Sequence, residues 1–153
     1  MPYLKDDGWM TLSGRPIGCI HEHIAKHFKE GKYSFHVGSD SKTYTESTTV
    51  ITTICFREPS RGAIVAYQKT HVPNFPNMTL KLLHEAQIAI EAAETVRNII
   101  GNPPTVHADV NSDKNALSNR SINVIKGVVE GMGFPILVKP NAWAADIADM
   151  FTR

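Results

Sequence analysis

The first half of the chain alternates apolar and polar residues in a way that predicts three consecutive β-strands. The alternation is clearest over residues 33–40, which end in Asp40. Residues 48–56 are rich in β-branched side chains, and residues 63–69 form a third strand-like run after a short turn. Because the link between the second and third runs is short, we expect an antiparallel hairpin, and we interpret all three strands as antiparallel.

Apolar residues recur at helical spacing over residues 17–29 and, over a longer stretch, 79–100. Further along the chain, short strands alternate with helices: we expect strands at 105–110 and 135–139, and helices at 116–130 and 143–153. After the N-terminal helix the order is therefore β-β-β-α-β-α-β-α. Helices between the later strands imply parallel crossovers, so the pattern predicts an α/β fold with one mixed five-stranded sheet and an extra N-terminal helix.

The 153 residues are expected to form one domain, with an arm and helix over 1–30 and the core over 31–153. The opening to about residue 16 is rich in glycine and polar residues and is expected to pack as an irregular arm. No apolar run approaches the roughly 20 residues that span a bilayer, and no signal peptide is evident. A cytoplasmic protein without a membrane partner is expected.

The net charge is close to neutral, with 16 Lys and Arg against 15 Asp and Glu. This balance argues against a strong, sequence-independent grip on nucleic acid, which needs clustered positive charge. A protein that acts on nucleic acid would therefore need a local basic patch or a protein partner. Homo-oligomer formation is a further option, since an exposed edge strand of the hairpin could pair subunits.

Four acidic residues occupy positions that this order of elements would bring together: Asp40 at a strand end, Glu85 on the long helix, Asp109 at a later strand end and Asp149 on the last helix. Clustered carboxylates repel one another unless cations are bound, and their oxygens are the ligands that Mg²⁺ and Mn²⁺ prefer. We expect two such ions, with Asp40 as the bridging ligand, and phosphoryl-transfer chemistry. Asp146, one turn before Asp149, competes for the fourth role.

Two histidines and two lysines lie near the same predicted edge. His36 and His107 each precede a proposed ligand by two residues on the same strand face. They could transfer protons near neutral pH or could be hydrogen-bonded core histidines. Lys42 and Lys139 could contact phosphates of the substrate or only offset the carboxylates.

Three motifs resemble those of the YkuK-type ribonuclease H-like family, small and poorly characterised bacterial and phage proteins. They are VGSDSK at 37–42, HADV at 107–110, and KPNAWAA at 139–145 followed by Ala-Asp at 148–149. The resemblance covers most of the chain from about residue 33. It implies a ribonuclease H-like fold and a presumed Mg²⁺ or Mn²⁺ site formed by the four carboxylates.

The leading hypothesis is a divalent-metal-dependent nuclease that hydrolyses phosphodiester bonds of a nucleic acid of unspecified type by a two-metal-ion mechanism. The alternative is a non-catalytic nucleic-acid- or protein-binding module that retains the fold. An idle cluster of like charges would cost stability, which counts against the module. A nucleotide-binding ATPase is a weaker interpretation, because no glycine-rich phosphate loop is present.

Overall fold

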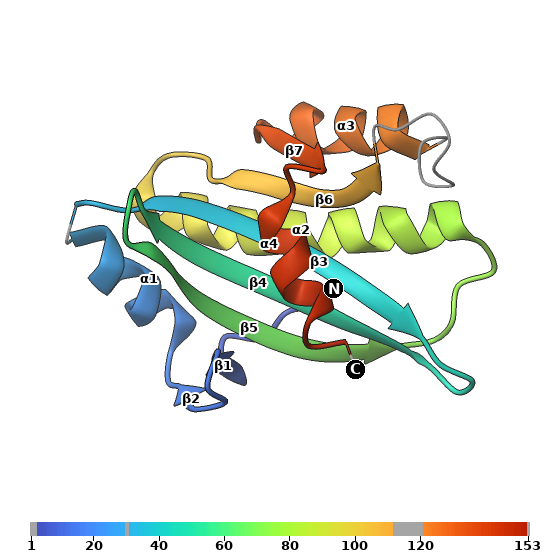
Figure 1. Ribbon diagram of the computed structural model, residues 1–153, viewed down its shortest axis with the longest axis horizontal. Helices are drawn as coiled ribbons and strands as arrows, with labels where there is room; N and C mark the ends of the chain where they lie inside the picture. Colours follow the sequence, from blue (N-terminus) through green and yellow to red (C-terminus); the bar gives the residue numbers. More distant parts are fainter. Residues whose placement is uncertain (1–2, 30, 112–120, 153) are drawn as a thin grey trace.

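The computed structural model describes residues 3–29, 31–111 and 121–152, which form a mixed sheet with helices on both faces (Figure 1). The elements in chain order are β1 (Trp9–Thr11), β2 (Pro16–Ile17), α1 (Ile20–Lys29), β3 (Ser34–Thr43), β4 (Thr48–Glu58), β5 (Gly62–Val72), α2 (Met78–Ile100), β6 (Thr105–Asn111), α3 (Ile122–Gly131), β7 (Ile136–Lys139) and α4 (Trp143–Asp149). The predicted α/β class with a single mixed sheet is confirmed. The predicted number of five strands is wrong, because the sheet has seven, in the order β2-β1-β5-β4-β3-β6-β7.

The two additional strands come from the segment expected to be an irregular arm. β1 pairs antiparallel with β2 and with β5, and Trp9 is buried at 2% exposure. The side chain of Gln68 on β5 accepts from the backbone N–H of Lys5 and donates to the backbone oxygen of Asp7. Since Ile17 pairs within β2, α1 begins three residues later than its apolar spacing predicts.

The pairing of the central strands determines where β3 and β6 separate. β3, β4 and β5 pair antiparallel along nearly their whole lengths, whereas β6 and β7 run parallel beside them. β3 continues to Thr43 because its last residues pair with β4, so Asp40 lies inside the strand and not at its end as expected. The β3–β6 pairing, however, ends at Gly38 and His107. Asp40 and Asp109 therefore lie just beyond the point where the two strands stop pairing.

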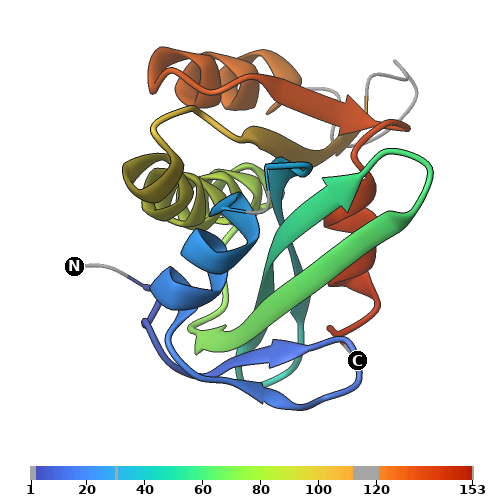
Figure 2. The same ribbon diagram turned by 90° about the vertical axis from the view of Figure 1, so that its left-hand side faces the viewer.

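The helices divide between the two faces of the sheet (Figures 1 and 2). α2 packs on β3, β4 and β6 and is flanked by α1 and α3, while α4 crosses β3 and β4 on the opposite face. The ends of α2 are well defined: the Asn77 side chain accepts from the N–H of Leu80, and Gly101 ends the helix at φ 81°. α2 thus presents a fixed, largely apolar face to the sheet.

The described part of the third predicted helix is α3, and the predicted start at residues 116–120 lies outside the described residues. Among the described residues, none of the helices combines the length and apolar character needed to cross a membrane.

Candidate metal centre

Three carboxylates from three different elements meet where β3 and β6 separate. Asp40 comes from β3, Glu85 from α2 and Asp109 from β6, and one carboxylate oxygen of each lies within 4.8 Å of the others. Asp40 and Glu85 are only 5% and 4% exposed, and Asp109 is half-buried. The structure therefore brings together three of the four acidic residues singled out from the sequence.

The residues on either side of Asp40 fix the helix that carries Glu85. Ser39 Oγ donates to the backbone oxygen of Glu85 at 2.6 Å, and Ser41 Oγ donates to Glu85 Oε1. Alternate residues of a strand point to opposite faces, so Ser39 and Ser41 reach α2 while Asp40 lies on the other face. Sequence reasoning did not include either serine, although this alternation within the Ser-Asp-Ser motif could have identified both.

The second oxygen of Glu85 is buried without a hydrogen-bond partner among the described residues. Burial raises the pKa of Glu85 to about 8, against the opposing effects of the Ser41 hydrogen bond and the Lys81 charge. A buried carboxylate oxygen without a donor costs free energy, so a native protein is expected to supply a partner. A bound cation would satisfy this oxygen.

Asp40 is the most strongly perturbed carboxyl group of the cluster. Burial is the largest cause that raises its pKa to about 10, followed by hydrogen bonding and charge repulsion from Asp109, the charge of Glu85 and a hydrogen bond with Asp149. Burial and the neighbouring carboxyl groups therefore favour the protonated form of Asp40 when no metal is bound. Metal binding replaces such a proton, and an all-oxygen donor set fits Mg²⁺ or Mn²⁺.

The two acidic residues of α4 lie differently relative to this cluster. Both are exposed, but Asp149 is hydrogen-bonded to Asp40, whereas Asp146 acts electrostatically on Lys139. Asp149 lies outside the group of three whose oxygens fall within 4.8 Å. Of the two, Asp149 is thus the better placed to add a fourth carboxylate.

The sheet positions α4 through contacts with its first turn. A Cβ atom on Gly38 would lie 2.7 Å from the backbone of Ala144 and Ala145, so only glycine permits this close approach. Thr53 Oγ1 donates to the backbone oxygen of Ala144 at 3.1 Å, and the Ala144 N–H donates to His107 Nδ1 at 3.2 Å. These contacts set the position of the helix that carries Asp149.

His36 and His107 form a hydrogen-bonded chain that leads away from the carboxylates. Because His107 Nδ1 accepts from Ala144, a neutral His107 must donate from Nε2 to His36 Nδ1, 3.0 Å away. His36 Nε2 then donates to Ser34 Oγ at 2.9 Å, and the Trp143 ring packs against both imidazoles. Burial lowers the pKa of His36 to about 4 and that of His107 to about 3. This arrangement favours the core interpretation over proton transfer.

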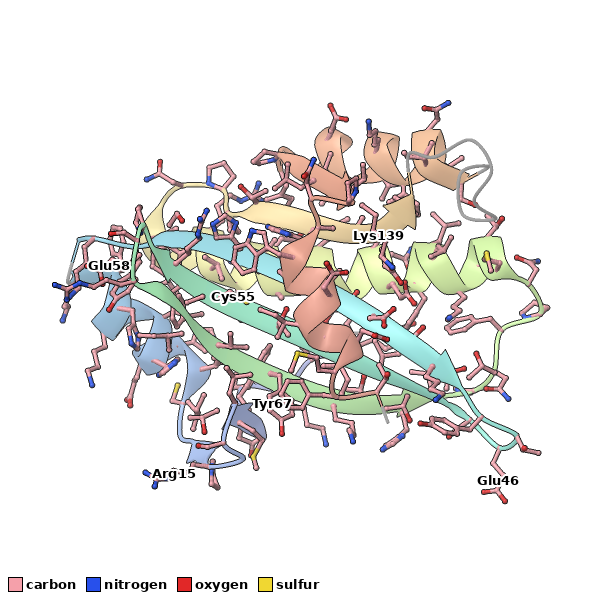
Figure 3. The ribbon with its side chains drawn as sticks, in the orientation of Figure 1. Arg15, Glu46, Cys55, Glu58, Tyr67 and Lys139 are labelled. Carbon is pink, nitrogen blue, oxygen red and sulfur yellow. The ribbon has the colours of Figure 1, made fainter. Side chains whose placement is uncertain are left out.

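One lysine is a partner of the cluster. Lys139, labelled in Figure 3, lies at the end of β7. Its Nζ is 2.5 Å from Oδ1 of Asp109 on the neighbouring strand. The hydrogen bond to Asp109 raises the pKa of Lys139. Of the two roles left open for Lys139 by the sequence, this ion pair is the one in which the lysine offsets a carboxylate. Lys42 is exposed, and its Nζ lies 5.6 Å from the centre of the Tyr44 ring.

Comparison with known proteins agrees with this geometry. A family model described as Ribonuclease H-like matches residues 17–153, which include all four elements that carry the acidic residues. No curated protein matches the chain. On the strength of the family match, supported by the mixed sheet and the buried carboxylates, the chain belongs to the ribonuclease H-like family.

Proposed function

We propose that the protein is a nuclease that hydrolyses phosphodiester bonds by a two-metal-ion mechanism with Mg²⁺ or Mn²⁺. Asp40, Glu85 and Asp109 are the ligands, and Asp149 is the fourth. The observation that carries this proposal is the meeting of three carboxylates within 4.8 Å, one of which has a buried oxygen without a partner among the described residues.

The environments of the carboxylates suit different parts of this task. Asp40 interacts with the three other carboxyl groups, which is the position required of a bridging ligand. Glu85 is held at one oxygen by Ser41, so its other oxygen is oriented toward the ligand position. When bound, two divalent cations would activate the attacking water and stabilise the charge on the leaving oxygen. Lys139, beside Asp109, offers a positive charge to a substrate phosphate.

Within the family, the motifs at 37–42, 107–110 and 139–145 support membership of the YkuK-type branch of bacterial and phage proteins. A non-catalytic nucleic-acid- or protein-binding module is the competing function. It is less favoured because a cluster of buried like charges that performs no task would lower stability.

The test is cleavage of a labelled panel comprising an RNA–DNA hybrid, duplex DNA, single strands and a four-way junction, with Mg²⁺ or Mn²⁺. We expect metal-dependent cutting by the wild type, its loss in Asp40→Asn, and its retention in Glu130→Gln, a matched carboxylate-to-amide change at the exposed end of α3. If no member is cut while metal raises the melting temperature of the wild type alone, the centre binds metal without catalysis and the module is correct.

A further inference from the structure

The sheet face that carries α4 extends beyond this helix toward the turn between β3 and β4 (Figure 1). Two rows of directly paired residues cross this part of the sheet: Asp40–Ile51–Lys69 and Lys42–Thr49–His71. Residues opposite one another in antiparallel strands share a face, as do residues two apart in one strand. Gly38, two residues before Asp40, contacts α4 and so identifies the face.

Three side chains on this face form what we call the basic shelf: Lys42, Lys69 and His71. All three are exposed, although the sheet beneath them is well ordered by pairing. His71 Nδ1 lies 3.2 Å from Thr49 Oγ1, which fixes the ring against the central strand. The shelf is adjacent to the metal centre, because Lys42 follows Asp40 by two residues, a rise of about 7 Å along the strand.

An aromatic ring lies at the margin of the basic shelf. Tyr44 is 41% exposed, and Lys42 Nζ lies 5.6 Å from its ring centre. Its hydroxyl donates to the backbone oxygen of Thr152 at 2.7 Å, so the ring is held in place without being covered. An exposed, fixed aromatic beside positive charges has the composition of a single-strand binding site, in which bases stack while cations follow the backbone.

The charge of the whole chain explains why such a local patch matters. With a net charge of +1, the protein has little overall attraction for a polyanion, and the carboxylates of the metal centre repel one. Cations on the same face as Asp40 supply attraction at the entrance to the site. Glu46, at the tip of the turn, is an exposed acidic residue beyond the shelf (Figure 3).

We propose that the basic shelf binds the sugar–phosphate backbone of one single strand of nucleic acid that leads to the metal centre, and that Tyr44 stacks on one of its bases. This inference rests on the proposed function. The outer strands of the shelf, β3 and β5, are two interstrand spacings apart, about 10 Å. This width suits one backbone rather than a duplex, whose major groove alone is about 12 Å wide.

The test measures binding of a short labelled single strand, and of its duplex, to the full chain in a chelator, where no metal-dependent cutting occurs. The variant is Lys42→Gln with Lys69→Gln, and the matched control is Lys26→Gln with Lys29→Gln on α1, on the other side of the sheet (Figure 2). We expect the shelf variant to bind the single strand about tenfold more weakly and to lower the slope of log K against log salt by about 1.4, or about 0.7 per phosphate. The control should change affinity by less than about twofold.

The aromatic part is tested separately with Tyr44→Leu and Tyr44→Phe. Leucine removes the stacking surface and should weaken single-strand binding about tenfold, whereas phenylalanine keeps the ring and should bind like the wild type. Equal loss in both lysine double variants, tighter binding of the duplex than of the single strand, or no binding by the wild type would overturn the inference.

The outcome separates this inference from the proposed catalysis. If the wild type cuts nothing with metal but the shelf variant still loses single-strand binding, the nuclease proposal fails and the shelf remains. If the wild type cuts but the shelf variant binds unchanged, the shelf is wrong and the nuclease proposal is unaffected.

Discussion

The two faces of the sheet hold their carboxylates in opposite ways. On one face, α2 is a 23-residue helix packed into the main apolar core, and its Glu85 is buried and hydrogen-bonded to β3. On the other, α4 has seven residues, packs with Cys55 and Val65 in a small second apolar cluster, and carries an exposed Asp149. One proposed ligand is thus fixed by the main core, and the position of the other depends on how a short helix packs on the sheet.

This difference suggests that the carboxylates on the two faces of the sheet have different roles in metal binding. A ligand fixed by packing is in position before metal binds, which lowers the cost of assembling the centre. An exposed ligand on a short helix can adjust as metal and substrate arrive, and leaves the adjoining sheet face open. The predictions that follow test whether the two faces differ in this way.

The largest effect is expected from removing one ligand on each face. Glu85→Gln should lower the cleavage rate about a thousandfold, on the order of 4 kcal/mol of transition-state stabilisation, whereas Asp149→Asn should cost about tenfold. The isosteric glutamine can still accept from Ser41, so the fold should be preserved. Single-turnover kinetics at saturating metal would measure both, and equal losses would contradict the proposed difference.

Next comes the pH dependence of the metal-free protein. Asp40 and Glu85 have pKa values of about 10 and about 8, above their usual 3.8 and 4.5, so the folded state holds protons that the unfolded state has released. Their contribution to stability is therefore lost as the pH rises from about 4 toward these values. Between pH 7 and 9 the free energy of unfolding should fall by on the order of 3 kcal/mol.

This window lies above the unfolded-state pKa of histidine, so His36 and His107 do not contribute. Urea unfolding in a chelator would measure the loss, and Asp40→Asn should show a shallower decline. Saturating Mg²⁺ should also reduce it, because metal takes the place of the proton. If the free energy of unfolding in chelator did not change with pH, the carboxyl groups of Asp40 and Glu85 would not be protonated in the metal-free protein.

A smaller effect on activity is expected from disturbing the packing of α4 on the sheet. Gly38→Ala places a Cβ atom 2.7 Å from the α4 backbone, which should cost about 1–3 kcal/mol of stability and lower activity by displacing Asp149. Gly127→Ala, at a helical glycine with nothing within 4 Å, is the matched control and should stabilise by about 0.5–1 kcal/mol. Thermal melting would compare the stability of the two variants, and cleavage assays would compare their activity. Unchanged activity in Gly38→Ala would contradict the prediction that the position of Asp149 matters for catalysis.

The smallest effect is expected on metal affinity, from replacing Lys139 beside the carboxylate cluster. Lys139→Gln removes the cation that pairs with Asp109, so Mg²⁺ should bind a few-fold more tightly, as expected for a partly exposed pair worth about 1 kcal/mol or less. Titration calorimetry would measure the affinity, with Lys29→Gln on α1 as the charge-matched control. Weaker metal binding would mean that Lys139 orients Asp109 more than it competes with metal.

The sequence predicted those features that depend on local periodicity. Strand alternation identified the segment with Asp40, helical spacing identified the helix with Glu85, and both residues lie at the carboxylate cluster. β1 and β2 were missed because three- and two-residue strands have no measurable period, and their pairing depends on distant contacts such as those of Gln68. The sequence left open whether Lys139 offsets the carboxylates, and it could not identify Asp109 as the partner, since the pair joins neighbouring strands that are far apart in sequence.

The Ser-Asp-Ser segment of β3 also determines where this protein can tolerate changes in chain length. Asp40 faces α4 while the serines beside it hold α2, so inserting one residue earlier in β3 would exchange the two faces and aim a serine at the metal position. An insertion in the turn after Thr43 would leave that alternation intact. Added residues or a spectroscopic label are therefore expected to be tolerated better at the tip of the β3–β4 turn beyond Tyr44, as at the exposed Glu46, than within β3.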